Sequence, residues 1–234
     1  MNELQSFFLA NMVPVFFVYG LSFLFMFAVI IWQSRQSPPL ELVEGFMLLA
    51  GFGLLHGLTE WTDMLRLIVT SPPTLVSALA IVKLALLATS FQYLFLFGHH
   101  TFTAASAEAR MRFAVLASPG IAAVYAAILY FTLVDLGLGE QVIRLTLGVS
   151  GAALTSLAFL RLTRKLGALG LEKSALDCLV VAIAFGCYAI CSGLLHDPSG
   201  QPVLVLSLPI QVYRAACAII IAVFVARFLY FFRR

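Results

Sequence analysis

The chain has 234 residues, of which 62% are hydrophobic and 11% are charged, with a formal net charge of +3. Soluble domains are about 45–50% apolar and about 25% charged, so this composition excludes a soluble enzyme, a nucleic-acid-binding protein and a disordered protein. A spanning helix needs about 20 apolar residues, and seven of them with short loops would use the whole length. We therefore predict an all-α, polytopic membrane protein, with residues 1–234 forming a single domain.

Apolar stretches that are long enough to cross a bilayer follow one another along the chain. The predicted spans cover residues 12–32, 42–61, 73–97, 113–134, 140–161, 174–195 and 203–230. Alternate loops, with the span ends next to them, hold nearly all the basic residues apart from those deep in the spans: Arg35, Arg110, Arg112, Arg161, Arg164, Lys165, Lys173, Arg227, Arg233 and Arg234. Because cytoplasmic loops are enriched in Lys and Arg, we expect the N-terminus outside and the C-terminus in the cytoplasm.

Ionisable residues interrupt several of the predicted spans. They are His56, Glu60, Lys83, Arg144 and Arg214. Such residues are costly in a membrane and usually face the protein interior or a water-filled cavity. At a rise of 1.5 Å per residue, all of them fall in the outer half of the bilayer or near its midplane. The shared depth predicts one polar cluster there.

Two interpretations of this cluster are open. His56, Glu60 and Asp63 have helical spacing, so they lie on one face of their helix, while Gln211 and Arg214 form a polar stripe on the last helix. The carboxylates could simply neutralise the cations in a structural network. Alternatively, the cluster could be the floor of an outward-opening pocket, in which Arg214 and Lys83 meet the acidic end of a small amphiphilic ligand.

A haem or metal site is an alternative prediction, and the cofactor is left unknown. His56, Glu60 and Asp63 share one helix face, and His196 lies at a comparable depth. Two His could bind haem axially, or the group could hold a divalent metal, in a membrane sensor or an oxidoreductase that uses His56 with His196 or Glu60. A transporter that uses Glu60 and Lys83 as a proton-coupled pair is a competing class, although no span is broken by Gly and Pro at mid-membrane. No nucleophile–base pair is readable from the spacing, so no catalytic residue is predicted.

Three stretches resemble the multi-helix membrane input regions of bacterial sensor histidine kinases and diguanylate cyclases. They are residues 21–33, Phe52–Met64 and Pro209–Ala215. The resemblance implies a sensory domain of the bacterial inner membrane that works as a homodimer and signals through its last helix to a cytoplasmic module. Together with the depth argument, it gives the predicted ligand-binding residues: His56, Glu60, Trp61, Lys83, Arg144, Gln211 and Arg214.

Overall fold

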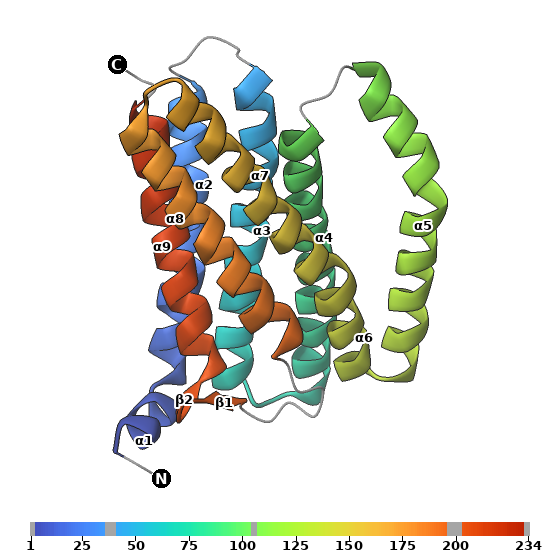
Figure 1. Ribbon diagram of the computed structural model, residues 1–234. Helices are drawn as coiled ribbons and strands as arrows, with labels where there is room; N and C mark the ends of the chain where they lie inside the picture. The colour runs from blue at the N-terminus through green and yellow to red at the C-terminus, as the bar shows by residue number, and fades with distance from the viewer. Residues whose placement is uncertain (1–2, 36–40, 104–106, 196–202, 232–234) are drawn as a thin grey trace.

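The computed structural model describes residues 3–35, 41–103, 107–195 and 203–231, and the side chains of these residues except 41–44 and 103–119. The chain forms a helix bundle, as predicted (Figure 1). Its helices are α1 (Glu3–Ala10), α2 (Met12–Ser34), α3 (Glu41–Ile68), α4 (Pro73–Thr103), α5 (Ala107–Val134), α6 (Leu136–Ile143), α7 (Val149–Ala168), α8 (Glu172–Ala189) and α9 (Ile210–Phe231). Two π-helical turns, η1 (Arg144–Gly148) and η2 (Ile190–Leu194), continue α6 into α7 and extend α8.

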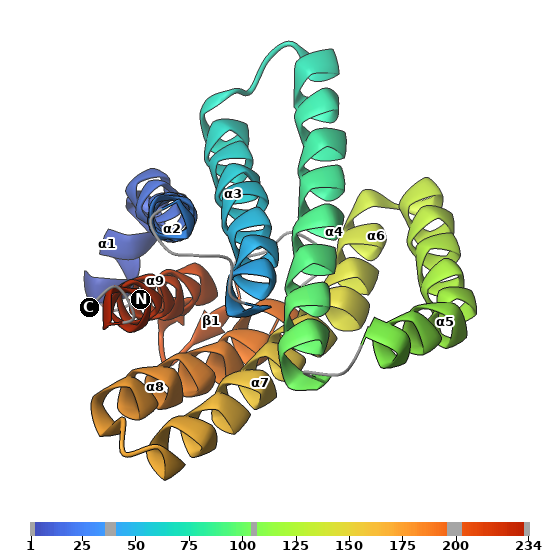
Figure 2. The ribbon, with the colours of Figure 1, turned by 90° about the horizontal axis from the view of Figure 1, so that it is seen from above.

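The helices form a bundle with one element at its side. Viewed from above, α2, α3, α4, α7, α8 and α9 pack around a common interior, whereas α5 lies outside this group next to α6 (Figure 2). The turn between α5 and α6 is fixed by Asp135, whose carboxylate accepts a hydrogen bond from the Leu138 amide at 3.0 Å. Asp135 therefore caps α6 at its N-terminus, where the first amides of a helix have no partner within the helix.

Five helical segments are long and apolar enough to cross a membrane, which indicates a multi-pass membrane protein. They are Met12–Ser34, Pro73–Phe102, Leu136–Ala168, Glu172–Leu194 and Ile210–Phe231. The other two predicted spans also lie in helices, α3 and α5. Helix α3 is less apolar because it carries the polar residues of the predicted cluster, and the described apolar part of α5 is the shorter segment Gly120–Val134.

The start of the last predicted span is wrong. Residues 203–209 are not helical, because β1 (Leu204–Val205) and β2 (Leu208–Pro209) pair as a small antiparallel hairpin, and α9 begins at Ile210. Pro209 has no amide hydrogen and disfavours a helical conformation in the residue before it. Arg214 consequently lies one turn into α9, about 6 Å from its first residue. The end of the bundle that carries this hairpin is called the hairpin end below.

Aromatic rings fill the half of the bundle interior that lies away from the hairpin end. Phe46 packs against Phe97 and Phe228 with ring centroids 5.6 and 5.8 Å apart. Phe159 lies 5.8 Å from Phe97 and 6.2 Å from Phe185. All five side chains are at most 3% exposed. The polar residues of the predicted cluster lie nearer the hairpin end.

Helices α4 and α7 approach closely at Gly98, and this contact makes a first prediction. A Cβ at Gly98 would lie 2.7 Å from the Thr155 nitrogen, a backbone atom that cannot turn aside. Gly98→Ala should therefore lower the free energy of unfolding by about 1–3 kcal/mol. Gly167→Ala is the matched control, because a Cβ there meets no described atom within 4 Å. It should raise stability by up to ~1 kcal/mol. Thermal melting of both variants in detergent tests this, and equal melting temperatures would contradict the close approach.

Candidate functional site

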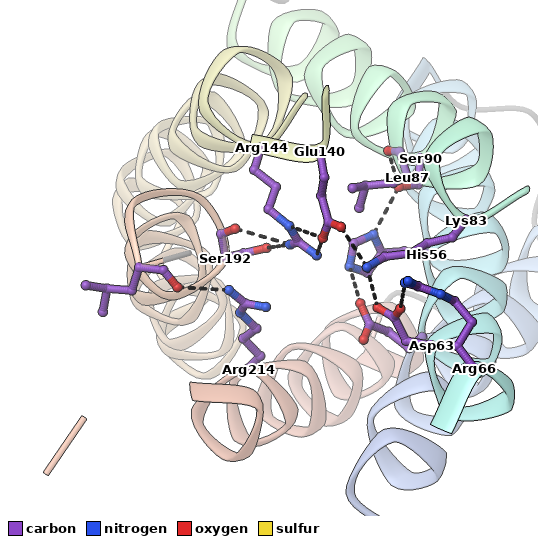
Figure 3. A network of polar contacts seen from close by, with 12 residues as sticks. His56, Asp63, Arg66, Lys83, Leu87, Ser90, Glu140, Arg144, Ser192 and Arg214 are labelled. Carbon is purple, nitrogen blue, oxygen red and sulfur yellow. Dashed lines mark hydrogen bonds and ion pairs between the residues drawn. The ribbon is translucent and has the colours of Figure 1, made fainter. Parts of the chain in front are cut away.

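A network of buried polar side chains occupies the hairpin end of the bundle (Figure 3). The residues come from α3, α4, α6, the two π-helical turns and α9, and their side chains point toward one another across the interior. The structure thus brings together His56, Glu60, Lys83, Arg144 and Arg214, as the shared depth in the sequence predicted. Each of these residues is at most 6% exposed.

Glu140 is the centre of the charged part of the network. Its Oε2 lies 2.8 Å from Lys83 Nζ, and its Oε1 lies 2.9 Å from Arg144 Nε and 2.8 Å from Arg144 Nη2. Lys83 Nζ also lies 2.9 Å from Asp63 Oδ2. Two cations and two carboxylates are therefore in direct contact. The side chain of Arg66, 35% exposed, extends this chain to the rim through Asp63 Oδ1 at 3.1 Å.

His56 is the centre of a second part of the network, which is built mainly from hydrogen bonds. Its Nδ1 lies 3.0 Å from Ser90 Oγ, and its Nε2 lies 2.5 Å from the Tyr188 hydroxyl. The Tyr188 hydroxyl is in turn 2.8 Å from that of Tyr19. The same Nε2 lies 3.3 Å from Glu60 Oε1. Hydrogen bonds thus connect α2, α3, α4 and α8 through a single imidazole.

Three phenylalanine rings enclose His56. The ring centroids of Phe23, Phe52 and Phe91 lie 5.0, 5.0 and 5.1 Å from that of His56. His56 is fully buried. Its hydrogen bonds are consequently formed in apolar surroundings, where a polar group left without a partner costs the most free energy.

Arg214 is held differently from the other two buried cations. It donates from Nε to the Cys191 carbonyl at 2.8 Å and from Nη2 to the Leu195 carbonyl at 3.1 Å. Within the described part of the chain it makes no ion pair with a carboxylate. Its positive charge is therefore compensated by backbone dipoles alone at close range.

These carbonyls lie in η2 and directly after it, at the end of the α8–η2 helix, where the last carbonyls have no partner within the helix. In a π-helix the amide of residue i+5 bonds to the carbonyl of residue i, as the Leu195 amide does with Ile190, and π-helical turns are often found at functional sites. Arg144 uses the same turn, since its Nη1 lies 3.2 Å from both the carbonyl and the hydroxyl of Ser192. Two guanidinium groups, from η1 and α9, are thus anchored on η2.

Two predicted ligand-binding residues take no part in the hydrogen bonds and ion pairs of the network among the described residues. Trp61 stacks on Phe17, with centroids 5.8 Å apart, and donates to the Phe17 carbonyl at 3.2 Å. Trp61 therefore fastens α3 to α2. Gln211 precedes Arg214 by one turn of α9, and its buried Oε1 has no hydrogen-bond partner among the residues that the structure describes.

The structure does not add support for the haem or metal alternative. His196 lies outside the described residues. Among those that are described, no three His, Cys, Asp or Glu side chains are grouped so as to hold a metal ion. Both ring nitrogens of His56 have hydrogen-bond partners. In this structure His56 and Glu60 are therefore hydrogen-bonding groups of the network.

Other network residues were not among the predicted ligand-binding residues. Glu140 stands four residues before Arg144, a spacing typical of an ion pair on one helix face. Tyr188 and Ser192 have the same spacing on the α8–η2 helix. These spacings in the sequence indicate that the residues of each pair lie on one helix face. Tyr19 and Ser90 gave no such indication, because their partners in the network come from other helices.

The network leaves one positive and one negative charge without a direct opposite partner among the described residues. Arg214 contacts carbonyl groups, and the Glu60 carboxylate contacts a histidine ring nitrogen. The other buried charges of the network contact each other. Comparisons of the chain with protein-family models, with curated proteins and with solved structures found no match.

Proposed function

We propose that the chain is a sensory input domain of the bacterial inner membrane that binds a small anionic amphiphile at Arg214. The observation that carries the proposal is the buried Arg214 guanidinium, which has no carboxylate at close range among the described residues. A ligand anion would supply the missing charge, because hydrogen bonds between a guanidinium and an anion are among the strongest in proteins. The unpartnered Gln211 Oε1, one turn away, is an acceptor only, so it would meet a hydroxyl or amide hydrogen of the ligand and not its anionic group.

The proposal includes seven spans with the N-terminus outside. Helices α3 and α5 have 28 residues each, a length of about 42 Å. The polar residues of α3 face the interior, where His56 and Glu60 are at most 2% exposed, while Met47 and Leu65 on its outer side are 43% exposed. An α3 with this arrangement presents apolar side chains to lipid. The alternation of basic loops supports the orientation, which places the hairpin end and Arg214 on the outer side.

Helix α9 is the proposed transmitter. It packs between α2 and α8, and runs from the hairpin to the opposite end of the bundle (Figure 1). Arg214, near its start, holds the Cys191 carbonyl in η2 and the Leu195 carbonyl directly after it. A ligand that competes for the guanidinium would weaken these bonds and favour a different position of α9 against α8. The ligand can shift the equilibrium between the two arrangements of α9 only as far as its affinities for them differ. We propose that the protein is a homodimer and that a cytoplasmic signalling module responds to the changed position of α9.

Binding of decanesulfonate to the purified protein in lipid nanodiscs tests the site. This probe is an anionic amphiphile, and decanol is its uncharged counterpart. We expect the wild type to bind decanesulfonate, and Arg214→Gln to bind it about 10–150-fold more weakly, the equivalent of ~1.5–3 kcal/mol for a hydrogen bond to a charged group. Arg164→Gln is the matched control, because Arg164 is an exposed arginine, and it should bind as the wild type does.

Three results would overturn the proposal. They are equal affinity for decanesulfonate and decanol, undiminished binding by Arg214→Gln, and no binding by the wild type. Should Arg214→Gln not fold, Arg214→Lys keeps the charge but loses the planar pair of donors, and weaker binding is again expected. Uptake of decanesulfonate into protein-containing liposomes, above that in protein-free liposomes, would favour a transporter over a sensor.

A further inference from the structure

We propose that binding of an anion at Arg214 is coupled to the uptake of one proton, which is held between His56 Nε2 and Glu60 Oε1. The inference rests on the proposed function, and it adds a second ligand, the proton, to the same site. It follows from the hydrogen bonds around His56 and from the balance of charge in the network.

The hydrogen bonds of Ser90 determine where the His56 ring carries its first proton. The Leu87 carbonyl lies 2.8 Å from Ser90 Oγ and can only accept, so the Ser90 hydroxyl hydrogen is directed at it. Ser90 Oγ then accepts from His56 Nδ1, 3.0 Å away. Nδ1 therefore carries a hydrogen, and in the neutral ring Nε2 is an acceptor.

Nε2 faces two groups, and one of them is a carboxylate. The Tyr188 hydroxyl, at 2.5 Å, can donate to a neutral Nε2. Glu60 Oε1, at 3.3 Å, cannot donate while Glu60 is ionised, so two acceptors would face each other. A single proton, on either Nε2 or Oε1, turns this contact into a hydrogen bond. The geometry thus provides a place for one proton between the two residues.

The charge of the network depends on this proton. Without it, the pair carries the negative charge of Glu60, so Glu60, Asp63 and Glu140 face Lys83, Arg144 and Arg214. Arg66, at the rim and 35% exposed, is left out of this count because solvent screens its charge. With it, the pair is neutral, and three cations face two carboxylates. The unbalanced positive charge is then that of Arg214, the cation without a carboxylate at close range among the described residues. An anion at Arg214 and a proton on the pair therefore favour each other.

Other charged and titratable groups surround the His56–Glu60 pair. None of them is placed to balance the charge of Arg214 by gaining or losing a proton as the pair does. Asp63 and Glu140 each contact Lys83, and Glu140 also contacts Arg144. The groups around the pair are Tyr19 on α2, Asp63 on α3, Lys83 on α4, Glu140 on α6, Arg144 on η1, Tyr188 on α8 and Arg214 on α9. The change of charge is consequently assigned to Glu60 with His56.

The affinity for decanesulfonate between pH 5 and pH 9 tests the inference. The probe keeps its charge over this range, so any change comes from the protein. We expect wild-type affinity to rise as the pH falls, with a limit of tenfold per pH unit for one coupled proton. In Glu60→Gln the pair is neutral without the extra proton, so binding should be tight and independent of pH. Glu172→Gln, at an exposed glutamate, should keep the wild-type slope.

Proton uptake by the wild type can also be measured directly. Calorimetric titrations with decanesulfonate, in two buffers of different ionisation enthalpy, give the number of protons bound with each probe molecule. This measurement needs no variant and stands if Glu60→Gln does not fold. Wild-type binding with no pH dependence and no proton uptake would overturn the inference and leave the proposed function intact. A wild-type slope in Glu60→Gln would overturn the assignment, whereas a wild type that binds no probe would overturn both proposals.

Discussion

Replacing Glu140 by glutamine is expected to lower the free energy of unfolding by about 3–5 kcal/mol. Glu140 contacts two buried cations, Lys83 and Arg144, through different carboxylate oxygens. Glutamine has nearly the same shape but no charge, so the packing is retained and the compensation is lost. Lys83 keeps Asp63 as a partner, whereas Arg144 loses its one carboxylate contact among the described residues. An uncompensated buried charge is the physical cause of the loss.

Unfolding of the purified protein by sodium dodecyl sulfate in mixed micelles measures this effect. Glu172→Gln is the control for removal of a glutamate charge at an exposed position, and should change stability by no more than ~0.5 kcal/mol. A double variant, Glu140→Gln with Arg144→Met, removes both charges of the pair. It should be more stable than the sum of the single effects implies, by about 1 kcal/mol or more. Additive effects would show that the ion pair does not contribute as a pair.

Replacing His56 by alanine should cost a similar amount, about 3–5 kcal/mol, by analogy with the removal of a buried aromatic ring. The imidazole fills the space between Phe23, Phe52 and Phe91, and its loss leaves a cavity. It also leaves the buried Glu60 carboxylate without its contact at 3.3 Å. A buried polar group deprived of its partner adds to the cost.

Two further variants separate packing from hydrogen bonding at His56. His56→Phe restores most of the volume but not the hydrogen bonds, so it should fall between the wild type and His56→Ala. Tyr130→Ala removes an aromatic side chain that is 64% exposed, and should change stability by about 0.5 kcal/mol or less. If His56→Phe were as stable as the wild type, the hydrogen-bonded chain through Tyr188 would contribute nothing to folding.

The arrangement of two arginines on η2 suggests how the network could respond to a ligand. Arg144 and Arg214 hold neighbouring carbonyls of the same π-helical turn, from η1 and from α9. In α9, Gln211 precedes Arg214 by one turn, so the two side chains lie on the same side of the helix. A change in the bonds of Arg214 therefore acts directly on the contact between α8 and α9.

The polar cluster was predictable in part, for a definite reason. In a span, an ionisable residue must face inward, so depth along each helix placed His56, Glu60, Lys83, Arg144 and Arg214 in one layer before any packing was known. The partners of each residue were not predictable in this way. The sequence allowed Glu60 to neutralise a cation. In the structure Glu60 contacts His56, and Arg144 forms its ion pair with Glu140.

The amino-acid sequence by itself determined the class of the protein, its helices and the layer in which the buried charges lie, because these follow from hydrophobicity and from the rise of a helix. The tertiary structure decided the rest. The hairpin at 204–209 and the start of α9 depend on Pro209 and on strand pairing. The contacts of Tyr19, Ser90 and Arg214 depend on which helices are neighbours and on the π-helical turns. Such contacts join residues distant in the chain, so no local pattern specifies them.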